Sequence, residues 1–148
     1  MLRGRTDQTI DPKSRIILPK QFRKYLLDEH GNTLVLTNFD NCVLAFPKEE
    51  WLDFEDRLNK LPSGDRNVRA YKRFLLSGAT ECTFDRQGRL LIPPSLKTYA
   101  NLQRDVVIIG LSDRFEIWDK KRFDAGLDQI KDFEKSDKGS EFLDKLGL

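Results

Sequence analysis

Arg15 and Arg89 each stand four residues after an aspartate, in two copies of one short pattern. The first copy reads Asp11-Pro12-Lys13-Ser14-Arg15, and 74 positions later the second reads Asp85-Arg86-Gln87-Gly88-Arg89. A guanidinium group can donate two parallel hydrogen bonds to guanine O6 and N7 or to a phosphate. The repeated arginine therefore favours binding of a base edge or an anion.

The two aspartates of the pattern are a poor fit for contact with DNA, because a carboxylate repels phosphate. Each can instead accept backbone N–H groups of its own turn and orient the arginine four residues on. Direct reading of a base by the aspartate is the less favoured alternative. The predicted turn scaffold consists of Asp11, Asp85, Ser14 and Gly88.

The pattern lies within a longer internal duplication. Residues 9–26 match 83–100 at an offset of 74, and 33–46 match 105–118 at an offset of 72. Each copy spans about 45 residues, close to the size below which a lone domain struggles to bury enough core. We expect one structural domain, divided into a first repeat (5–51), connecting helices (52–76), a second repeat (77–123) and a C-terminal helix with a mobile tail (124–148).

Each copy is predicted to run strand, turn, strand, short helix, strand, turn, strand. Asp at the first turn position, with Pro second or Gly fourth, favours a type I turn, so both patterns are interpreted as hairpin tips. Pro19 and Pro93 suit the first position of the short helices. A further helix is predicted over Asn67 to Leu76, and residues 136–148 are expected to be mobile.

Apolar residues recur at helical spacing after each copy, which predicts two more helices. Such stripes usually face a core, although they can also face another subunit. The stripes are Trp51, Phe54, Leu58 and Leu61 after the first copy, and Phe123, Leu127, Ile130 and Phe133 after the second.

Positive charge gathers around the repeated pattern. Residues 1–24 carry seven Lys or Arg against two acids and residues 66–104 carry eight against two, although the whole chain has a net charge of only +2. A clustered basic surface is typical of a nucleic-acid binder, whereas scattered cations would only solvate helix faces. The candidate DNA contacts are Arg3, Arg5, Lys13, Arg15, Lys20, Arg23, Arg86, Arg89 and Lys97.

The sequence argues against several other classes. Asp11 and Asp85 could form a catalytic carboxylate pair, but each has an arginine nearby that would keep it ionised, and no phosphate-cradling loop or nucleophile elbow is present. His30 precedes Gly31 at a helix end and suits a capping role. Cys42 and Cys82 are expected to be buried free thiols. We predict no catalysis, cofactor, metal or small-molecule substrate, no membrane association, and a cytoplasmic location because no signal-like apolar stretch begins the chain.

The doubled Asp-x-x-x-Arg pattern, followed each time by three apolar residues and Pro, with Gly4-Arg5 upstream, resembles the MraZ family of bacterial transcriptional regulators over roughly residues 1–134. The resemblance implies an α+β fold: a swapped-hairpin β-barrel of the AbrB and SpoVT type, built from the chain's own two repeats around a pseudo-twofold axis, with helices after each repeat. It also implies ring-like homo-oligomers that bind repeated boxes in double-stranded DNA upstream of the division and cell-wall gene cluster, at the nucleoid. The alternative is an antitoxin-like interaction module built on the same barrel.

Two departures from the family pattern predict that the two turns differ. The family usually has Gly before each arginine, and this chain has Ser14 in the first copy and Gly88 in the second. If that position requires positive φ, Ser14 carries strain that Gly avoids. The second copy also has Gln87 where the first has Lys13, so the two turns are not expected to be equivalent in DNA binding, and the first turn, which carries Lys13 and more flanking basic residues, is the first choice for mutation.

Overall fold

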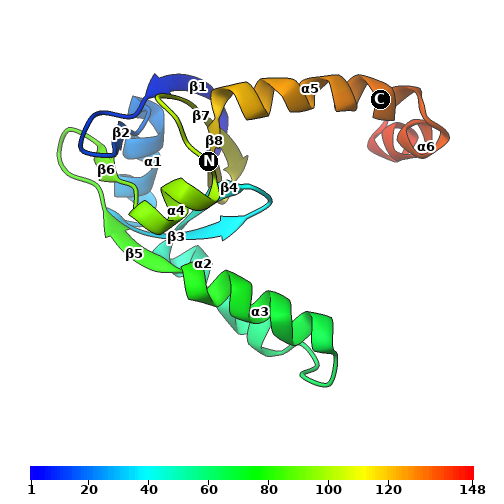
Figure 1. Cartoon of the computed structure of the whole chain (residues 1–148), viewed down its shortest axis with the longest axis horizontal. Coiled ribbons are helices and arrows are strands. Elements are labelled where there is room, and N and C mark those ends of the chain that lie inside the picture. The colour runs from blue at the N-terminus through cyan, green and yellow to red at the C-terminus, as the bar shows by residue number, and fades with distance from the viewer.

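A computed structural model describes residues 1–148 as six helices and eight strands (Figure 1). The first repeat contains β1 (Leu2–Thr9), β2 (Arg15–Ile17), α1 (Lys20–Glu29), β3 (Thr33–Phe39) and β4 (Cys42–Pro47), followed by α2 (Lys48–Asn59) and α3 (Arg66–Gly78). The second contains β5 (Thr80–Thr83), β6 (Arg89–Leu91), α4 (Pro94–Tyr99), β7 (Asp105–Ser112) and β8 (Phe115–Asp119), followed by α5 (Lys120–Lys135) and α6 (Asp137–Leu146). The predicted order of elements in each repeat is confirmed.

The strands pair across the two repeats. The larger sheet is antiparallel in the order β1-β7-β8-β4-β3-β5, so β1 of the first repeat pairs with β7 of the second, and β5 of the second pairs with β3 of the first. A separate two-stranded ribbon joins β2 to β6. The interpretation of the Asp-x-x-x-Arg segments as hairpin tips was therefore wrong in one respect: each turn links strands that pair with the other repeat.

The predicted swapped-hairpin β-barrel is not confirmed. The mixed α+β content and the exchange between repeats are present, but β1 and β5 are the unpaired edges of an open sheet. The short strands β2 and β6 pair with each other as a ribbon, and no ladder joins either of them to the larger sheet. The fold therefore consists of an open six-stranded sheet and a separate two-stranded ribbon.

One apolar core fills the space between the sheet, the ribbon and the two short helices. It includes Phe22 and Leu26 of α1, Leu96 of α4, and Ile16 and Leu90 of the ribbon, none more than 1 % exposed. Both repeats contribute to this cluster, which accounts for why half a chain would not bury it.

A second, smaller cluster covers the other face of the sheet beneath α2 and α3. Trp51 of α2 packs against Phe46 of β4, with ring centroids 5.5 Å apart. Two buried polar side chains of β3 fix α3: Thr37 Oγ1 donates to the Leu75 carbonyl at 2.6 Å, and Asn38 Nδ2 donates to the Phe74 carbonyl at 3.1 Å. These bonds give acceptors in the last turn of α3 partners outside the helix, and so fasten that turn to β3.

The helices after the second repeat differ from those after the first. Figure 1 shows α5 projecting from the body, with α6 turned back at its far end. No residue of α5 is buried, so the expectation that its stripe faces the core was wrong. The segment expected to be a mobile tail contains the helix α6, capped by Ser136 Oγ, which accepts the Gly139 N–H at 3.0 Å. No helix combines the length and apolar character needed to span a membrane.

Candidate nucleic-acid interface

Asp11 organises the first turn. Its Oδ1 accepts the backbone N–H groups of Lys13 and Arg15, each at 2.9 Å, and its Oδ2 accepts Arg15 Nε at 2.7 Å. The main chain closes the same turn, because the Ser14 N–H donates to the Asp11 carbonyl at 2.9 Å. Every one of these bonds joins residues at most four apart, so the turn is specified locally.

The second turn repeats this geometry. Asp85 Oδ1 accepts the N–H groups of Gln87 and Arg89 at 2.9 Å, and Asp85 Oδ2 accepts Arg89 Nε at 2.7 Å. The backbone N–H of Arg15 lowers the pKa of Asp11, and that of Arg89 lowers the pKa of Asp85, because both bonds favour the charged carboxylate. Each carboxylate is thus bound within its own turn.

The β2–β6 ribbon has one buried and one exposed face. Arg15 pairs with Leu91 and Ile17 pairs with Arg89, and paired residues of an antiparallel ladder project to the same side. Ile17 and Leu91 are 52 % and 55 % exposed. The Nη groups of both arginines have no hydrogen-bond partner within the chain, since only Nε is bound to the aspartate. The outer face of the ribbon therefore carries Arg15, Ile17, Arg89 and Leu91.

The residue before each arginine joins one repeat to the other. The Ser14 carbonyl accepts the Ile92 N–H at 2.9 Å, and the Gly88 carbonyl accepts the Leu18 N–H at 2.8 Å. Ser14 has φ 63° and Gly88 has φ 79°, so this position is left-handed in both repeats. Ser14 consequently carries the strain that Gly88 avoids.

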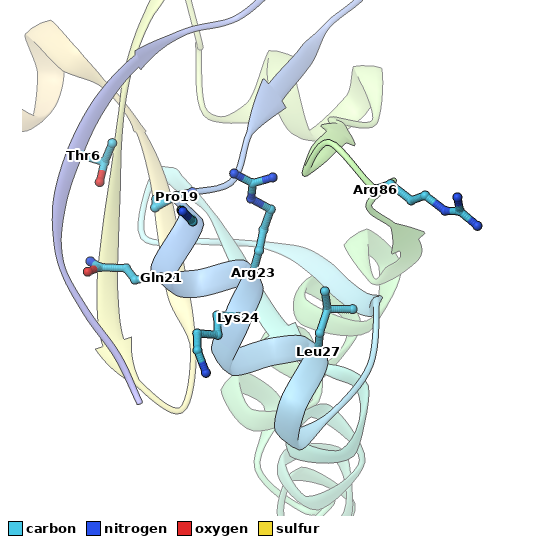
Figure 2. A pocket seen from close by; sticks show the side chains of 8 residues that line it. Thr6, Pro19, Gln21, Arg23, Lys24, Leu27 and Arg86 are labelled. Atoms are coloured by element: carbon cyan, nitrogen blue, oxygen red, sulfur yellow. The ribbon is translucent and has the colours of Figure 1, made fainter.

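The exchange of strands places each short helix beside the turn of the other repeat. Arg23 of α1 lies against Gly88, and Lys97 of α4 donates to Ser14 Oγ at 3.2 Å. Figure 2 shows α1 with the segment that carries Arg86 beside it. An open depression of about 710 Å³ lies here, lined by Thr6, Pro19, Lys20, Gln21, Arg23, Lys24, Leu27 and Arg86.

The remaining predicted contacts are dispersed. Lys13 is exposed at the tip of the first turn, and Arg3 is exposed on β1. Arg5 is bound to carboxylates, because its Nε donates to Asp7 at 2.8 Å and its Nη2 lies 2.9 Å from Asp124. The ion pairs with Arg5 and Lys120 lower the pKa of Asp7 to about 2. The structure therefore gives Arg5 a role in joining β1 to α5.

Sequence reasoning missed three residues of this region. Ile17 and Leu91 are not among the predicted DNA contacts, although the period of two from each arginine puts them on the same face. Lys24 is not among them either, although it lies one turn from Lys20 on α1. It forms an exposed ion pair with Asp28 at 3.0 Å.

Other candidate groups fall outside this region. His30 ends α1 as its C-cap residue, and its backbone N–H donates to the Leu26 carbonyl at 2.7 Å. Both cysteines are free, as expected, but Cys82 is only half-buried. No group of three or more His, Cys, Asp or Glu side chains is placed to hold a metal ion.

The fold and the two turns define a duplicated protein in which two repeats of one chain exchange strands around paired Asp-x-x-x-Arg turns. The family described as "MraZ protein, putative antitoxin-like" matches the chain twice, over residues 1–74 and 75–145. The chain belongs to this family, which confirms the resemblance seen in its sequence.

Curated relatives carry the name "Transcriptional regulator MraZ". The chain is 46 % identical to that of Nitratidesulfovibrio vulgaris over 127 residues, covering 84 % of this chain and 85 % of the relative. It is 42 % identical to that of Oenococcus oeni, covering 90 % and 99 %, and 41 % identical to that of Clostridium tetani, covering both chains in full. These similarities support a transcriptional regulator.

Proposed function

We propose that this protein regulates transcription by binding double-stranded DNA through the outer face of the β2–β6 ribbon and its two turns. The observation that carries the proposal is the ribbon face itself, on which Arg15 and Arg89 flank Ile17 and Leu91. The major groove of B-DNA admits a two-stranded ribbon. Arginine pairs with guanine there, and apolar side chains contact the thymine methyl group.

The aspartates contribute by fixing the two arginines. A side chain that is already held loses less conformational entropy on binding, which favours affinity. Each arginine is held through Nε at 2.7 Å, and its two Nη groups are left to meet a base or a phosphate. The carboxylates belong to this support and do not themselves face the DNA.

We extend the proposal to a homo-oligomer, of the ring-like form that the resemblance implies. The exposed stripe on α5 supports it, since Leu127, Ile130 and Phe133 are 40–53 % exposed on one chain. Several subunits would engage successive boxes and gain affinity by multivalency. The proposed target is the promoter region of the division and cell-wall gene cluster, and the proposed location is the cytoplasm, at the nucleoid.

The antitoxin-like alternative rests on the description of the family as "putative antitoxin-like". It requires a surface that captures a protein partner, and the exposed α5 stripe would be the candidate. The ribbon favours DNA binding over capture of a protein partner, because its two arginines are supported by carboxylates and suit the hydrogen-bond acceptors of a DNA groove. The apolar stripe on α5 has no comparable group that would select a partner.

The test is a binding titration of wild type, Arg15→Ala and Arg89→Ala against a duplex selected by the wild type from a random pool. Each substitution should weaken binding about tenfold or more, since a bidentate pair contributes about 1–3 kcal/mol of discrimination. Lys131→Ala, which removes an exposed cation from α5, is the matched control. Unchanged affinity and an unchanged salt slope for both arginine variants would contradict the proposal.

A further inference from the structure

The four cations of the depression beside α1 come from both repeats. Lys20, Arg23 and Lys24 lie on α1 of the first repeat, and Arg86 lies in the turn of the second (Figure 2). They meet because β2 pairs with β6 and brings the second turn against α1. This surface, the α1–turn 2 depression, is therefore absent from either repeat alone.

The cations of the α1–turn 2 depression are largely unpaired. Lys20, Arg23 and Arg86 have no acidic partner within the chain, and Arg23 Nε is buried without a hydrogen-bond acceptor. Lys24 pairs only with exposed Asp28, a contact of small energetic value. Four neighbouring positive charges repel one another, so an anion bound among them would relieve that repulsion.

The shape favours an extended anion over a compact one. Figure 2 shows the Arg23 side chain pointing from α1 toward the ribbon, whereas the Arg86 side chain extends outward from the neighbouring turn. The cations thus border an open depression and do not converge on one point. Phosphates spaced along a nucleic-acid strand match such a border, and a single small anion does not.

The pseudo-symmetric position beside α4 lacks this charge. Applying the offset of 74 places Pro94, Lys97 and Thr98 where α1 has Lys20, Arg23 and Lys24, and Pro12 where the second turn has Arg86. The depression there is about 430 Å³ and contains one cation, Lys97, which is bound to Ser14 Oγ at 3.2 Å. The duplication has thus kept the fold beside both α1 and α4, but the cluster of four cations lies only beside α1.

We infer that the α1–turn 2 depression is the main site at which the protein binds the phosphate backbone of DNA, and that it binds one DNA strand beside the Arg89 end of the ribbon. The inference rests on the proposed function for its ligand, since the phosphates are those of duplex DNA. One side of the pseudo-twofold axis then binds the DNA backbone, and the other contributes Lys13 and Lys97. Because the two sides differ in this way, each subunit binds its DNA box in one orientation.

The experiment measures how binding changes with salt. Full-length wild type, the double variant Lys20→Ala with Arg86→Ala, and the control Lys131→Ala with Lys135→Ala are titrated at several salt concentrations. Both double variants remove two exposed cations, so they match in net charge. The probes are the selected duplex and a random-sequence duplex of equal length, because phosphate contacts do not depend on sequence.

We expect the depression variant to lower the slope of log affinity against log salt by about 2, since each phosphate contact contributes about 0.9. The loss should be similar on both duplexes, and the α5 control should keep the wild-type slope. Equal slope changes in both double variants would show a net-charge effect and overturn the inference. An unchanged slope for the depression variant would also overturn it.

Two further arms separate this inference from the proposed function. If Arg15→Ala loses preference for the selected duplex while the depression variant keeps its slope, the ribbon function stands and the depression is not the backbone site. If wild type shows no preference for any duplex, the proposed function fails, and the random duplex still tests the depression. Micromolar binding of free pyrophosphate, lost in the depression variant with no change in DNA slope, would assign the site to a free phosphorylated ligand.

Discussion

Gly88 leaves open the space that the side chain of Arg23 occupies. A Cβ atom at Gly88 would collide with Arg23 Cδ and lie 2.7 Å from its Nε. At the equivalent contact the other repeat has Ser14 with Lys97, joined by a hydrogen bond of 3.2 Å. Glycine thus accompanies the bulkier arginine, and serine accompanies lysine.

Gly88→Ser should lower the free energy of unfolding by about 1–2 kcal/mol, because a non-glycine residue at positive φ is strained. It should also push Arg23 out of its place and weaken DNA binding. Arg23→Lys in the same chain should recover part of the stability, since lysine suits the contact with serine. Urea unfolding of the four members of this double-mutant cycle gives the coupling, and strictly additive effects would contradict the packing relationship.

Asp11 and Asp85 should make the fold sensitive to acid. Their pKa values are lowered in the folded state, first by the N–H groups of Arg15 and Arg89, so the carboxylates stabilise the protein above about pH 4 and this stabilisation is lost as pH falls through the folded-state values. The double variant Asp11→Asn with Asp85→Asn should be less stable than wild type at pH 7. The difference should shrink below pH 4.

Thermal unfolding from pH 7 to pH 2 measures this difference. Asp65→Asn, which changes an exposed helix cap outside both turns, is a control for the general effect of removing an acid. A gap between wild type and the double variant that stays constant down to pH 2 would contradict the role of the two carboxylates.

Ile130→Asp should break the proposed oligomer and leave the chain folded. Ile130 is 53 % exposed and α5 buries no residue, so the monomer loses little when the side chain becomes charged. Light scattering should report a smaller mass, with an unchanged circular dichroism spectrum. Ala125→Asp places the same charge on α5 outside the apolar stripe, and should keep the wild-type mass. An equal mass for both variants would exclude the stripe as an interface.

The two thiols should react at different rates. Burial raises the pKa of both Cys42 and Cys82, which lowers the fraction of reactive thiolate. Cys42 is fully buried and Cys82 is half-buried, so an aromatic disulfide reagent should modify Cys82 first and Cys42 only on unfolding. Loss of the fast phase in Cys82→Ala would identify it, and a fast phase that persists there would contradict the difference in burial.

Much of the fold could be predicted because its signals are local or repeated. The turn around Asp11 uses bonds between residues at most four apart, and the same spacing in the second copy produces the same distances. The order of strands and helices followed from short-range periodicity and from Pro19 and Pro93, although the structure places each proline at the N-cap and not, as predicted, at the first helical position. The family resemblance extended this to the exchange of strands.

The candidate site was only partly predictable. The arginines could be found by their spacing, but the partner of α1 could not, because Arg23 and Gly88 are brought together by a strand pairing between distant segments. The first turn was therefore the first choice for mutation, on the basis of the basic residues that flank it in sequence. In the folded chain, the basic residues of α1 that follow the first turn lie beside Arg86 of the second turn.

The sequence by itself determined the duplication, the two aspartate-supported turns and the excess of positive charge, since these depend on residue type and short spacing. Tertiary structure decided which strands pair, that the sheet stays open, that α5 is left exposed and that one depression collects four cations. The physical reason is the range of the interactions: a turn closes on itself, whereas strand pairing and burial depend on which distant surfaces the whole chain can bring into contact.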